Sequence, residues 1–200
     1  GEYGRMNKGE QWLANGVQCK LQVVPMDNYN HNTRYNLPIA PSPNLQTEEA
    51  IYLYPSLCLF EGTPISIGRG TKTPFQVYGH PQLTVGDYFF TPMPIKGVSE
   101  NPPQKGLQCR GYNLTAIASE QINKNNCFNI SYLLDAYKHF PDKAKFFNAN
   151  LFFDKLAGTR QLRKDIIAGK SEQEIRVSWE PQLQAFKEKR QMYLLYPDFE

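Results

Sequence analysis

The hydrophobic pattern changes along the chain, and this change limits the fold more than any other feature of the sequence. Between residues 17 and 117, apolar residues gather in short runs, the clearest with a period of two, which is typical of strands. From residue 130 onward they recur three, four or seven positions apart, which is typical of helices. This order predicts an α+β fold with a small, mostly antiparallel sheet, flanking helices and a helical C-terminal third.

Four segments are predicted as strands. The clearest alternation of apolar and polar residues is in "VQCKLQVVP" (17–25), and "GLQCRGYNLTAI" (106–117) alternates in the same way. The runs "SLCLFEG" (56–62) and "FQVYG" (75–79) are shorter and are also predicted as strands. The first strand would end at Pro25, because proline cannot donate a ladder hydrogen bond.

Helices are predicted at both ends of the chain and once between the strands. Residues 2–14 are expected to form a short amphipathic helix that stops before Gly16. Thr47 is expected to cap a second helix with an acidic first turn, which Pro55 ends. Near the C-terminus a helix is expected to begin near Trp179, just before Pro181. Its predicted buried stripe consists of Trp179, Leu183, Phe186 and Tyr193.

Residues 26–45 form a long segment rich in asparagine, proline and tyrosine, with no sustained period. Such a segment is longer than an ordinary connection in a compact domain, so it is either functional or disordered. Its aromatic and basic side chains favour a functional loop. They include Tyr29, His31, Arg34 and Tyr35.

Composition excludes several classes of protein. The 200 residues fit one domain and can bury a sizeable core, and a net charge of +3 with scattered basic residues argues against nucleic acid as a partner. No apolar run is long enough for a membrane span. The four cysteines have no CxxC spacing and are expected to be free thiols, although two disulfides in an exported protein stay open. The three histidines are isolated, so neither a metal site nor a cofactor is predicted.

The segment "IGRGTKTPF" (67–75) invites comparison with phosphate-binding loops. It lacks the lysine of a P-loop and the full GxGxxG pattern, so nucleotide binding is a weak alternative. Gly68 and Gly70 are instead expected to permit unusual backbone angles that direct Arg69. Glu61 is expected at the end of the strand 56–62, where it either forms a structural ion pair with Arg69 or faces a functional cleft.

Three motifs together resemble a known family. "PSPN" (41–44), "YPSLCLFEGT" (54–63) and "GRGTKTPF" (68–75) resemble the bacterial exo-β-N-acetylmuramidases of the NamZ type, long described as a domain of unknown function. The resemblance implies a Rossmann-like N-terminal subdomain followed by a smaller α/β subdomain, with the active site between them. Residues 1–200 are then expected to be a single α+β domain, the C-terminal subdomain of a longer protein.

The resemblance also implies a set of site residues. Glu61 is the candidate catalytic residue in this chain, although the main acid is expected in the upstream subdomain. Arg69 is expected to bind the lactyl carboxylate of muramic acid, because its planar guanidinium pairs bidentately with carboxylates. The full set of candidate substrate-binding residues is Glu2, Ser42, Asn44, Thr63, Arg69 and Thr71.

The implied function is release of terminal N-acetylmuramic acid during peptidoglycan recycling, by a protein that is periplasmic or otherwise exported. The expected partners are muramic acid glycosides and the protein's own N-terminal subdomain. This chain alone is expected to be inactive, because glycoside hydrolysis needs a positioned acid, which the resemblance places in the upstream subdomain. Ser56 and Pro64 depart from the family pattern, which leaves sugar preference open. The alternative is a non-catalytic cell-wall sugar-binding or interaction module.

Overall fold

The computed structural model describes residues 20–33, 35–121 and 128–198. The chain divides into two compact units. The larger unit consists of residues 37–175, and the smaller unit combines residues 1–36 with residues 176–200. The predicted helix at 2–14 lies outside the described residues.

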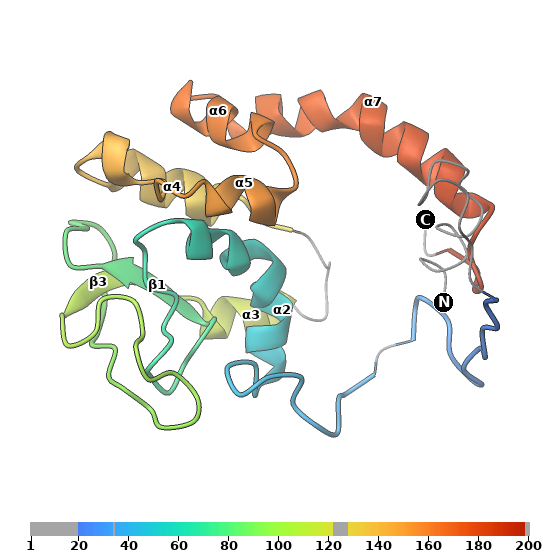
Figure 1. The fold of residues 1–200 in the computed structure, drawn as a ribbon, viewed down its shortest axis with the longest axis horizontal. Coiled ribbons are helices and arrows are strands. Elements are labelled where there is room, and N and C mark those ends of the chain that lie inside the picture. The colour runs from blue at the N-terminus through green and yellow to red at the C-terminus, as the bar shows by residue number, and fades with distance from the viewer. Residues whose placement is uncertain (1–19, 34, 122–127, 199–200) are drawn as a thin grey trace. The chain divides into compact units, whose positions relative to one another are not determined.

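The described part of the larger unit combines a small sheet with several helices (Figure 1), as an α+β fold requires. The prediction of an α+β fold with an antiparallel sheet is therefore confirmed. In chain order the elements of the described residues are α2 (Glu48–Leu57), η2 (Cys58–Gly62), β1 (Val77–His80), β2 (Tyr88–Phe90), β3 (Cys109–Asn113), α3 (Thr115–Gln121), α4 (Ser131–His139), η3 (Lys143–Lys145), α5 (Phe152–Ala157), α6 (Gln161–Ile167) and α7 (Glu172–Gln191). Residues 176–191 of α7 belong to the smaller unit.

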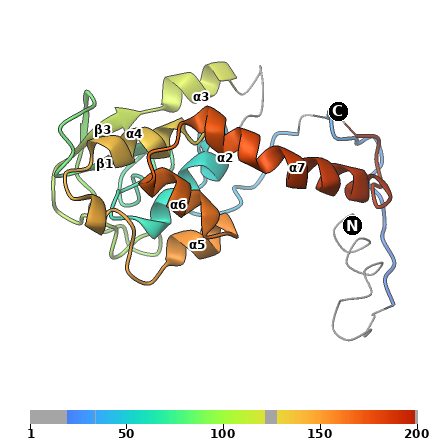
Figure 2. The ribbon, with the colours of Figure 1, turned by 90° about the horizontal axis from the view of Figure 1, so that it is seen from above.

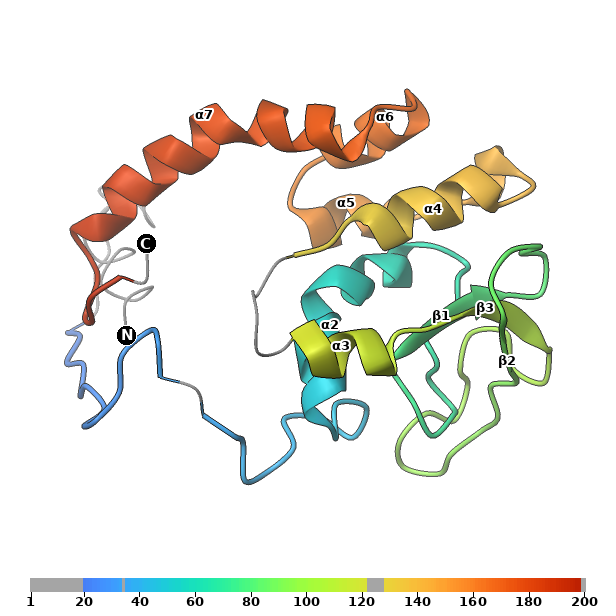
Figure 3. The ribbon, with the colours of Figure 1, turned by 180° about the vertical axis from the view of Figure 1, so that it is seen from behind.

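The sheet has three strands in the order β1-β3-β2, and both pairings are antiparallel (Figure 3). The predicted strand 75–79 is confirmed as β1, and the predicted strand 106–117 is confirmed as β3 over residues 109–113, whereas residues 115–117 begin helix α3. In β3 the alternation has a physical meaning, since Cys109 and Gly111 are buried while the intervening Arg110 is half-buried. Strand β2 was not predicted, because three residues without alternation carry no period-two signal.

Glycine at the centre of the sheet is required by the close approach of the chains. Gly79 of β1 lies opposite Gly111 of β3. A Cβ atom at position 111 would lie only 1.9 Å from the carbonyl oxygen of Tyr78. Nor could Gly86 carry a side chain, since its Cβ would lie 2.0 Å from the Gly111 carbonyl oxygen. The strands can pack this closely only because these positions lack side chains.

The N-terminus of α2 matches its prediction, but its C-terminus does not. The Thr47 side chain accepts a hydrogen bond from the Ala50 N–H at 3.2 Å, as expected of an N-cap. The prediction that Pro55 ends the helix was wrong, because α2 continues to Leu57. A proline removes only its own N–H from the hydrogen-bond ladder, and here the helix continues past it for two residues.

The predicted strand 56–62 is wrong. These residues complete α2 and form the 3₁₀ helix η2. Leu57, Leu59 and Phe60 are buried, and a short run with this composition fits a buried helical turn as well as a buried strand. Glu61 therefore lies on a helical turn rather than at a strand end.

The core of the larger unit forms where the helices meet the sheet. Figure 2 shows α2 between α3 and α5, and α2 contacts both α3 and α4, while α5 packs on η2. Phe60 stacks on Tyr78 of β1 with ring centroids 5.0 Å apart. The largest fully buried side chains include Phe60, Phe75, Phe146, Phe153, Leu57 and Ile65.

The helical C-terminal third is confirmed, but the start and the burial of its last helix were predicted wrongly. The segment 151–170 contains two helices, because Gly158 takes a left-handed φ of 68° and ends α5. Helix α7 begins at Glu172, so Pro181 lies in its interior and not near its start. The predicted stripe is not buried, since Leu183 is 42% and Phe186 is 48% exposed. Helical spacing identifies an apolar stripe but not what covers it.

The smaller unit is tied together around Tyr196 in its described residues. The Tyr196 hydroxyl accepts a hydrogen bond from the Met26 N–H at 2.7 Å, and the Tyr29 ring packs edge-on against its ring. The predicted strand 17–25 is not found over residues 20–25, and residues 17–19 lie outside the described part. Leu21 and Val23 are half-buried between exposed neighbours, but alternation without a partner strand does not make a sheet.

Cys58 and Cys109 are free thiols, as expected, while Cys19 and Cys127 lie outside the described residues. Burial raises the pKa of Cys109 to about 12, so this thiol is unreactive at neutral pH. Across the described segments, no cluster of three or more His, Cys, Asp or Glu side chains could hold a metal ion. Within the same segments, no helix is long and apolar enough to cross a membrane.

Replacing Gly111 with alanine is predicted to disrupt the sheet. The added methyl would overlap the Tyr78 carbonyl, so β1 and β3 would have to separate. The free energy of unfolding is expected to fall by about 3 kcal/mol or more. Gly97→Ala is the matched control, because Gly97 has a left-handed φ but open space around its Cβ position, and about 1 kcal/mol is expected. Urea unfolding of both variants gives the comparison, and equal losses would contradict the steric explanation.

Folding stability is predicted to decrease as the pH falls below about 6.5. Burial lowers the pKa of His80 from its ordinary value of 6.5, so the folded protein keeps the ring neutral where the unfolded chain takes up a proton. Because the unfolded state then binds more protons, acid favours unfolding. His80→Asn keeps an acceptor for the Gln82 N–H and should flatten this pH dependence between pH 7.5 and 5.5 in urea titrations. An unchanged slope would exclude His80 as its source.

Candidate functional site

The loop between η2 and β1 is held in one shape by its glycines and its hydrogen bonds. Gly68 and Gly70 both have left-handed φ angles, 77° and 80°, so the prediction of unusual backbone angles is confirmed. The Thr71 hydroxyl donates to the Gly68 carbonyl at 2.7 Å and accepts from the Thr73 N–H at 3.1 Å. The loop leads into a strand rather than a helix N-terminus, which removes the basis for nucleotide binding.

This loop directs Arg69 toward η2. Arg69 Nη2 donates to Glu61 Oε2 at 2.9 Å, which confirms the expected ion pair. The guanidinium carbon also lies 5.3 Å from the centre of the Phe75 ring. The two charged side chains remain 34% and 25% exposed, so the arginine is held in place but still reaches the surface.

Phe75, whose ring lies next to Arg69, has an unusual backbone conformation. Its φ of 57° is rare for a residue with a bulky side chain, and its ring is almost fully buried. Tyr54 packs against the same ring with centroids 5.0 Å apart. Burial, followed by the nearby Cys58 and Glu61, raises the pKa of Tyr54, so its hydroxyl stays protonated at neutral pH.

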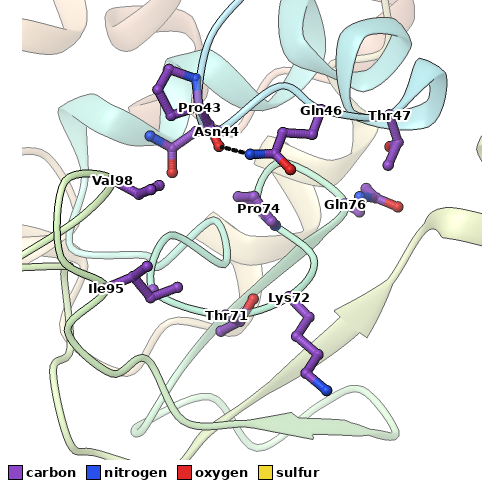
Figure 4. Close-up of a pocket in the computed structure, with 11 residues that line it drawn as sticks. Pro43, Asn44, Gln46, Thr47, Thr71, Lys72, Pro74, Gln76, Ile95 and Val98 are labelled. Atoms are coloured by element: carbon purple, nitrogen blue, oxygen red, sulfur yellow. Dashed lines mark hydrogen bonds between the residues drawn. The ribbon is translucent and has the colours of Figure 1, made fainter. Parts of the chain in front are cut away.

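The same loop also lines a pocket of about 340 Å³ (Figure 4). It is lined by residues from segments 43–47 and 70–76, and by Ile95 and Val98 of the loop that follows β2. Lys72 contributes the one cationic side chain among the lining residues, and the remaining walls are neutral amides, the hydroxyls of Thr47 and Thr71, and apolar groups. A volume of this size fits a monosaccharide.

Asn44 and Thr71 are the predicted site residues that line this pocket. Asn44 is held by a turn in which its N–H donates to the Ser42 hydroxyl at 3.3 Å and the Leu45 N–H donates to the Ser42 carbonyl at 2.9 Å. Ser42 itself is not among the lining residues and acts through this turn. The structure thus brings Asn44 and Thr71 together and places the Glu61–Arg69 pair beside the pocket loop.

Thr63, another predicted site residue, is not among the residues that line the pocket. Thr63 is 6% exposed, and its hydroxyl donates to the Phe60 carbonyl at 2.7 Å and accepts from the Ile65 N–H at 3.2 Å. Both contacts close the end of η2, so its contribution there is structural. Glu2 lies outside the described residues.

Several pocket residues were not predicted as site residues. Lys72 directly follows the predicted "GRGT" and could have been found by extending that motif by one position. Ile95 and Val98 belong to a proline-rich loop that showed no functional signal. Their place at the pocket depends on contacts such as the hydrogen bond from the Met93 N–H to the Gly70 carbonyl, at 2.8 Å, which no local pattern reveals.

Comparison with protein families decides the family of the chain. Residues 52–196 match the family described as "Exo-beta-N-acetylmuramidase NamZ, C-terminal", and residues 1–49 match its N-terminal counterpart. The chain belongs to the NamZ family. The pocket is lined by residues from both matched regions, because 43–47 belong to the N-terminal match and the lining residues between 70 and 98 belong to the C-terminal match.

Relatives of the chain agree with this assignment. It is 30% identical over 194 residues to the peptidoglycan β-N-acetylmuramidase NamZ of Bacillus subtilis (strain 168), covering 90% of this chain and 46% of the relative. A crystal structure of a DUF1343 family protein from Bacteroides fragilis NCTC 9343 matches 99% of this chain and 55% of its own, with 49% identity and a TM-score of 0.91. A second DUF1343 structure from the same organism shares the fold at 20% identity, with a TM-score of 0.75, over 98% of this chain and 55% of its own. The chain therefore spans about half the length of these NamZ relatives.

The Glu61–Arg69 pair is predicted to contribute little to folding. Its partly exposed side chains should give a coupling free energy of at most about 1 kcal/mol in a double-mutant cycle of Glu61→Gln and Arg69→Met. The matched comparison is Arg163–Asp154, whose side chains are only 19% and 10% exposed and which forms two hydrogen bonds. A larger coupling is expected there in urea unfolding; a stronger Glu61–Arg69 coupling would indicate that this pair is structural.

Proposed function

We propose that this chain is the C-terminal part of an exo-β-N-acetylmuramidase acting on peptidoglycan-derived glycosides, and that Arg69 binds the lactyl carboxylate of a terminal N-acetylmuramic acid. The reaction is proposed from the family match and from the printed activity of the Bacillus relative. The single observation that carries the role of Arg69 is its fixed but partly exposed guanidinium, held between Glu61 and Phe75 beside a sugar-sized pocket.

The geometry of Arg69 suits a carboxylate ligand. A guanidinium has five N–H donors, and the hydrogen bond to Glu61 uses one of them. Within the described residues no other hydrogen bond reaches this guanidinium, so a pair of its N–H groups can meet both oxygens of a carboxylate. Holding the arginine in advance reduces the entropy that binding would otherwise cost.

Glu61 is proposed to orient Arg69 rather than to transfer a proton. Its Oε2 atom faces the guanidinium, and the Asn148 side chain donates to its backbone carbonyl at 3.4 Å. Asn44 and Thr71 are proposed to contact the sugar in the pocket, while Ser42 and Thr63 hold the backbone near them. Glu2 is proposed to reach the same substrate.

The remaining machinery is proposed to lie in the upstream part of the longer protein. Glycoside hydrolysis needs a positioned acid and either a second carboxylate or a substrate group as nucleophile. The acid is expected upstream, so this chain alone should not hydrolyse a glycoside. Export of the full protein to the periplasm or beyond is proposed on the family resemblance.

Arg69→Ala in the full-length protein is predicted to raise the Michaelis constant for a chromogenic N-acetylmuramic acid glycoside at least about ten-fold, because a charged hydrogen-bond pair is lost. The methyl amide of the lactyl group is the comparison substrate. The wild type should prefer the free carboxylate, whereas Arg69→Ala should treat the two substrates alike. Steady-state kinetics on both substrates provide the measurement.

Arg160→Ala is the control, because Arg160 is an exposed arginine at the start of α6 and should leave both constants unchanged. A retained preference for the carboxylate in Arg69→Ala would remove the proposed role. If the full-length protein binds the sugar but hydrolyses none of these glycosides, the alternative of a non-catalytic sugar-binding module is favoured instead.

A further inference from the structure

The side-chain oxygen of Asn44 is buried without a hydrogen-bond donor. Asn44 is 8% exposed, and its Oδ1 atom has no hydrogen-bond partner in the described part of the chain. The other such oxygen among the described residues is Asp165 Oδ2, but the second oxygen of that carboxylate is held by Lys170 and Gln161. A buried amide oxygen without a donor opposes folding, because water satisfies it in the unfolded chain. Such an atom in a native structure calls for an explanation.

The position of Asn44 supplies one, because the residue lines the pocket. Figure 4 shows its amide oxygen directed toward the side on which Val98 lies. The turn at Ser42 fixes the Asn44 backbone before any ligand arrives, and burial restricts its side chain. In Gln46, the neighbouring amide of the pocket lining, Nε2 donates a hydrogen bond to the Pro43 carbonyl at 3.0 Å. Asn44 is therefore an acceptor that awaits a donor.

The walls around this oxygen define the rest of the ligand. Pro74, Ile95 and Val98 present apolar surface to the pocket, and no carboxylate is among the lining residues that the structure describes. A group that fits must carry an N–H or O–H donor and, next to it, a small apolar end. A secondary amide ending in a methyl group has both features, and its methyl would be removed from water against the apolar walls.

We propose that this pocket binds the acetamido group of an N-acetylated sugar. The acetamido N–H donates to Asn44 Oδ1, and the acetamido methyl packs against Ile95 and Val98. The assignment makes Asn44 the residue that selects N-acetylated sugars, and it rests on the proposed function for its choice of a sugar ligand. A site built around a hydrogen bond rejects an analogue that lacks the donor, because the buried acceptor then stays unpaired.

The test compares two free sugars that differ in one atom. N-acetylmuramic acid carries the N–H, while its 2-O-acetyl analogue keeps the acetyl group but has an oxygen in place of that nitrogen. Binding of the free sugars to the full-length protein is measured by isothermal titration calorimetry, because turnover could also change if the acetamido group takes part in the reaction. The wild type is expected to bind the acetamido sugar at least about ten-fold more tightly.

Two substitutions at position 44 separate recognition from folding. Asn44→Leu has nearly the same shape and no acceptor, so it should bind both sugars within about two-fold of each other. Asn44→Asp keeps an acceptor oxygen and should retain the preference. Asn101→Leu, which removes an exposed amide whose Oδ1 accepts from Lys105 Nζ at 3.4 Å, is the control and should also retain it. Because Asn44→Leu removes an unpaired buried oxygen, its melting temperature should not fall.

Each outcome bears on the inference separately from the proposed function. An undiminished preference for the acetamido sugar in Asn44→Leu would overturn the inference, even if the full-length protein hydrolyses muramic acid glycosides. A lower melting temperature with unchanged preference would overturn it as well and would make Asn44 a structural residue. If hydrolysis is absent but the preference is present and depends on Asn44, the inference stands and the proposed function fails.

Discussion

The contact between Gly70 and the loop after β2 is the constraint on which the candidate site depends. The Gly70 carbonyl accepts a hydrogen bond from the Met93 N–H, and a Cβ atom at position 70 would lie 2.5 Å from the Met93 carbonyl and 2.7 Å from Pro102 Cγ. Two chain segments more than twenty residues apart can therefore meet only because position 70 has no side chain. One wall of the pocket comes from each segment, so the pocket exists only while this contact holds.

The loop between η2 and β1 carries two kinds of chemistry. Arg69 presents a fixed positive charge that Glu61 and Phe75 support. Two residues further along the chain, Thr71 lines a mostly neutral pocket together with Asn44. A ligand that carries both a carboxylate and an uncharged amide would use the two parts differently, the arginine through charge and the pocket through shape and a single hydrogen bond. Muramic acid derivatives carry both groups, which links the two proposals without making either depend on the other's residues.

Local patterns in the sequence predicted the elements whose buried and exposed faces follow from their own residues. Strand β3 and helix α4 were found because burial alternates or recurs along each of them, and the Thr47 cap was found from its side chain. The segment 56–62 was misread because a buried 3₁₀ turn and a buried strand share the same apolar composition. Asn44 and Thr71 came from the family resemblance. Ile95 and Val98 could not be predicted, because their role arises from a contact between distant segments.

The boundary between the two family regions falls inside one compact unit, and this has an evolutionary consequence. Asn44 lies before residue 49 and the opposing pocket walls lie after residue 52, yet all of them belong to the unit 37–175. A recombination event between these positions would combine Asn44 with different opposing walls. The hydrogen-bond donor of the ligand would then no longer be positioned in the same way against the Asn44 side-chain oxygen. The two regions are therefore expected to be inherited together, and substitutions on one side of the boundary should be accompanied by substitutions on the other.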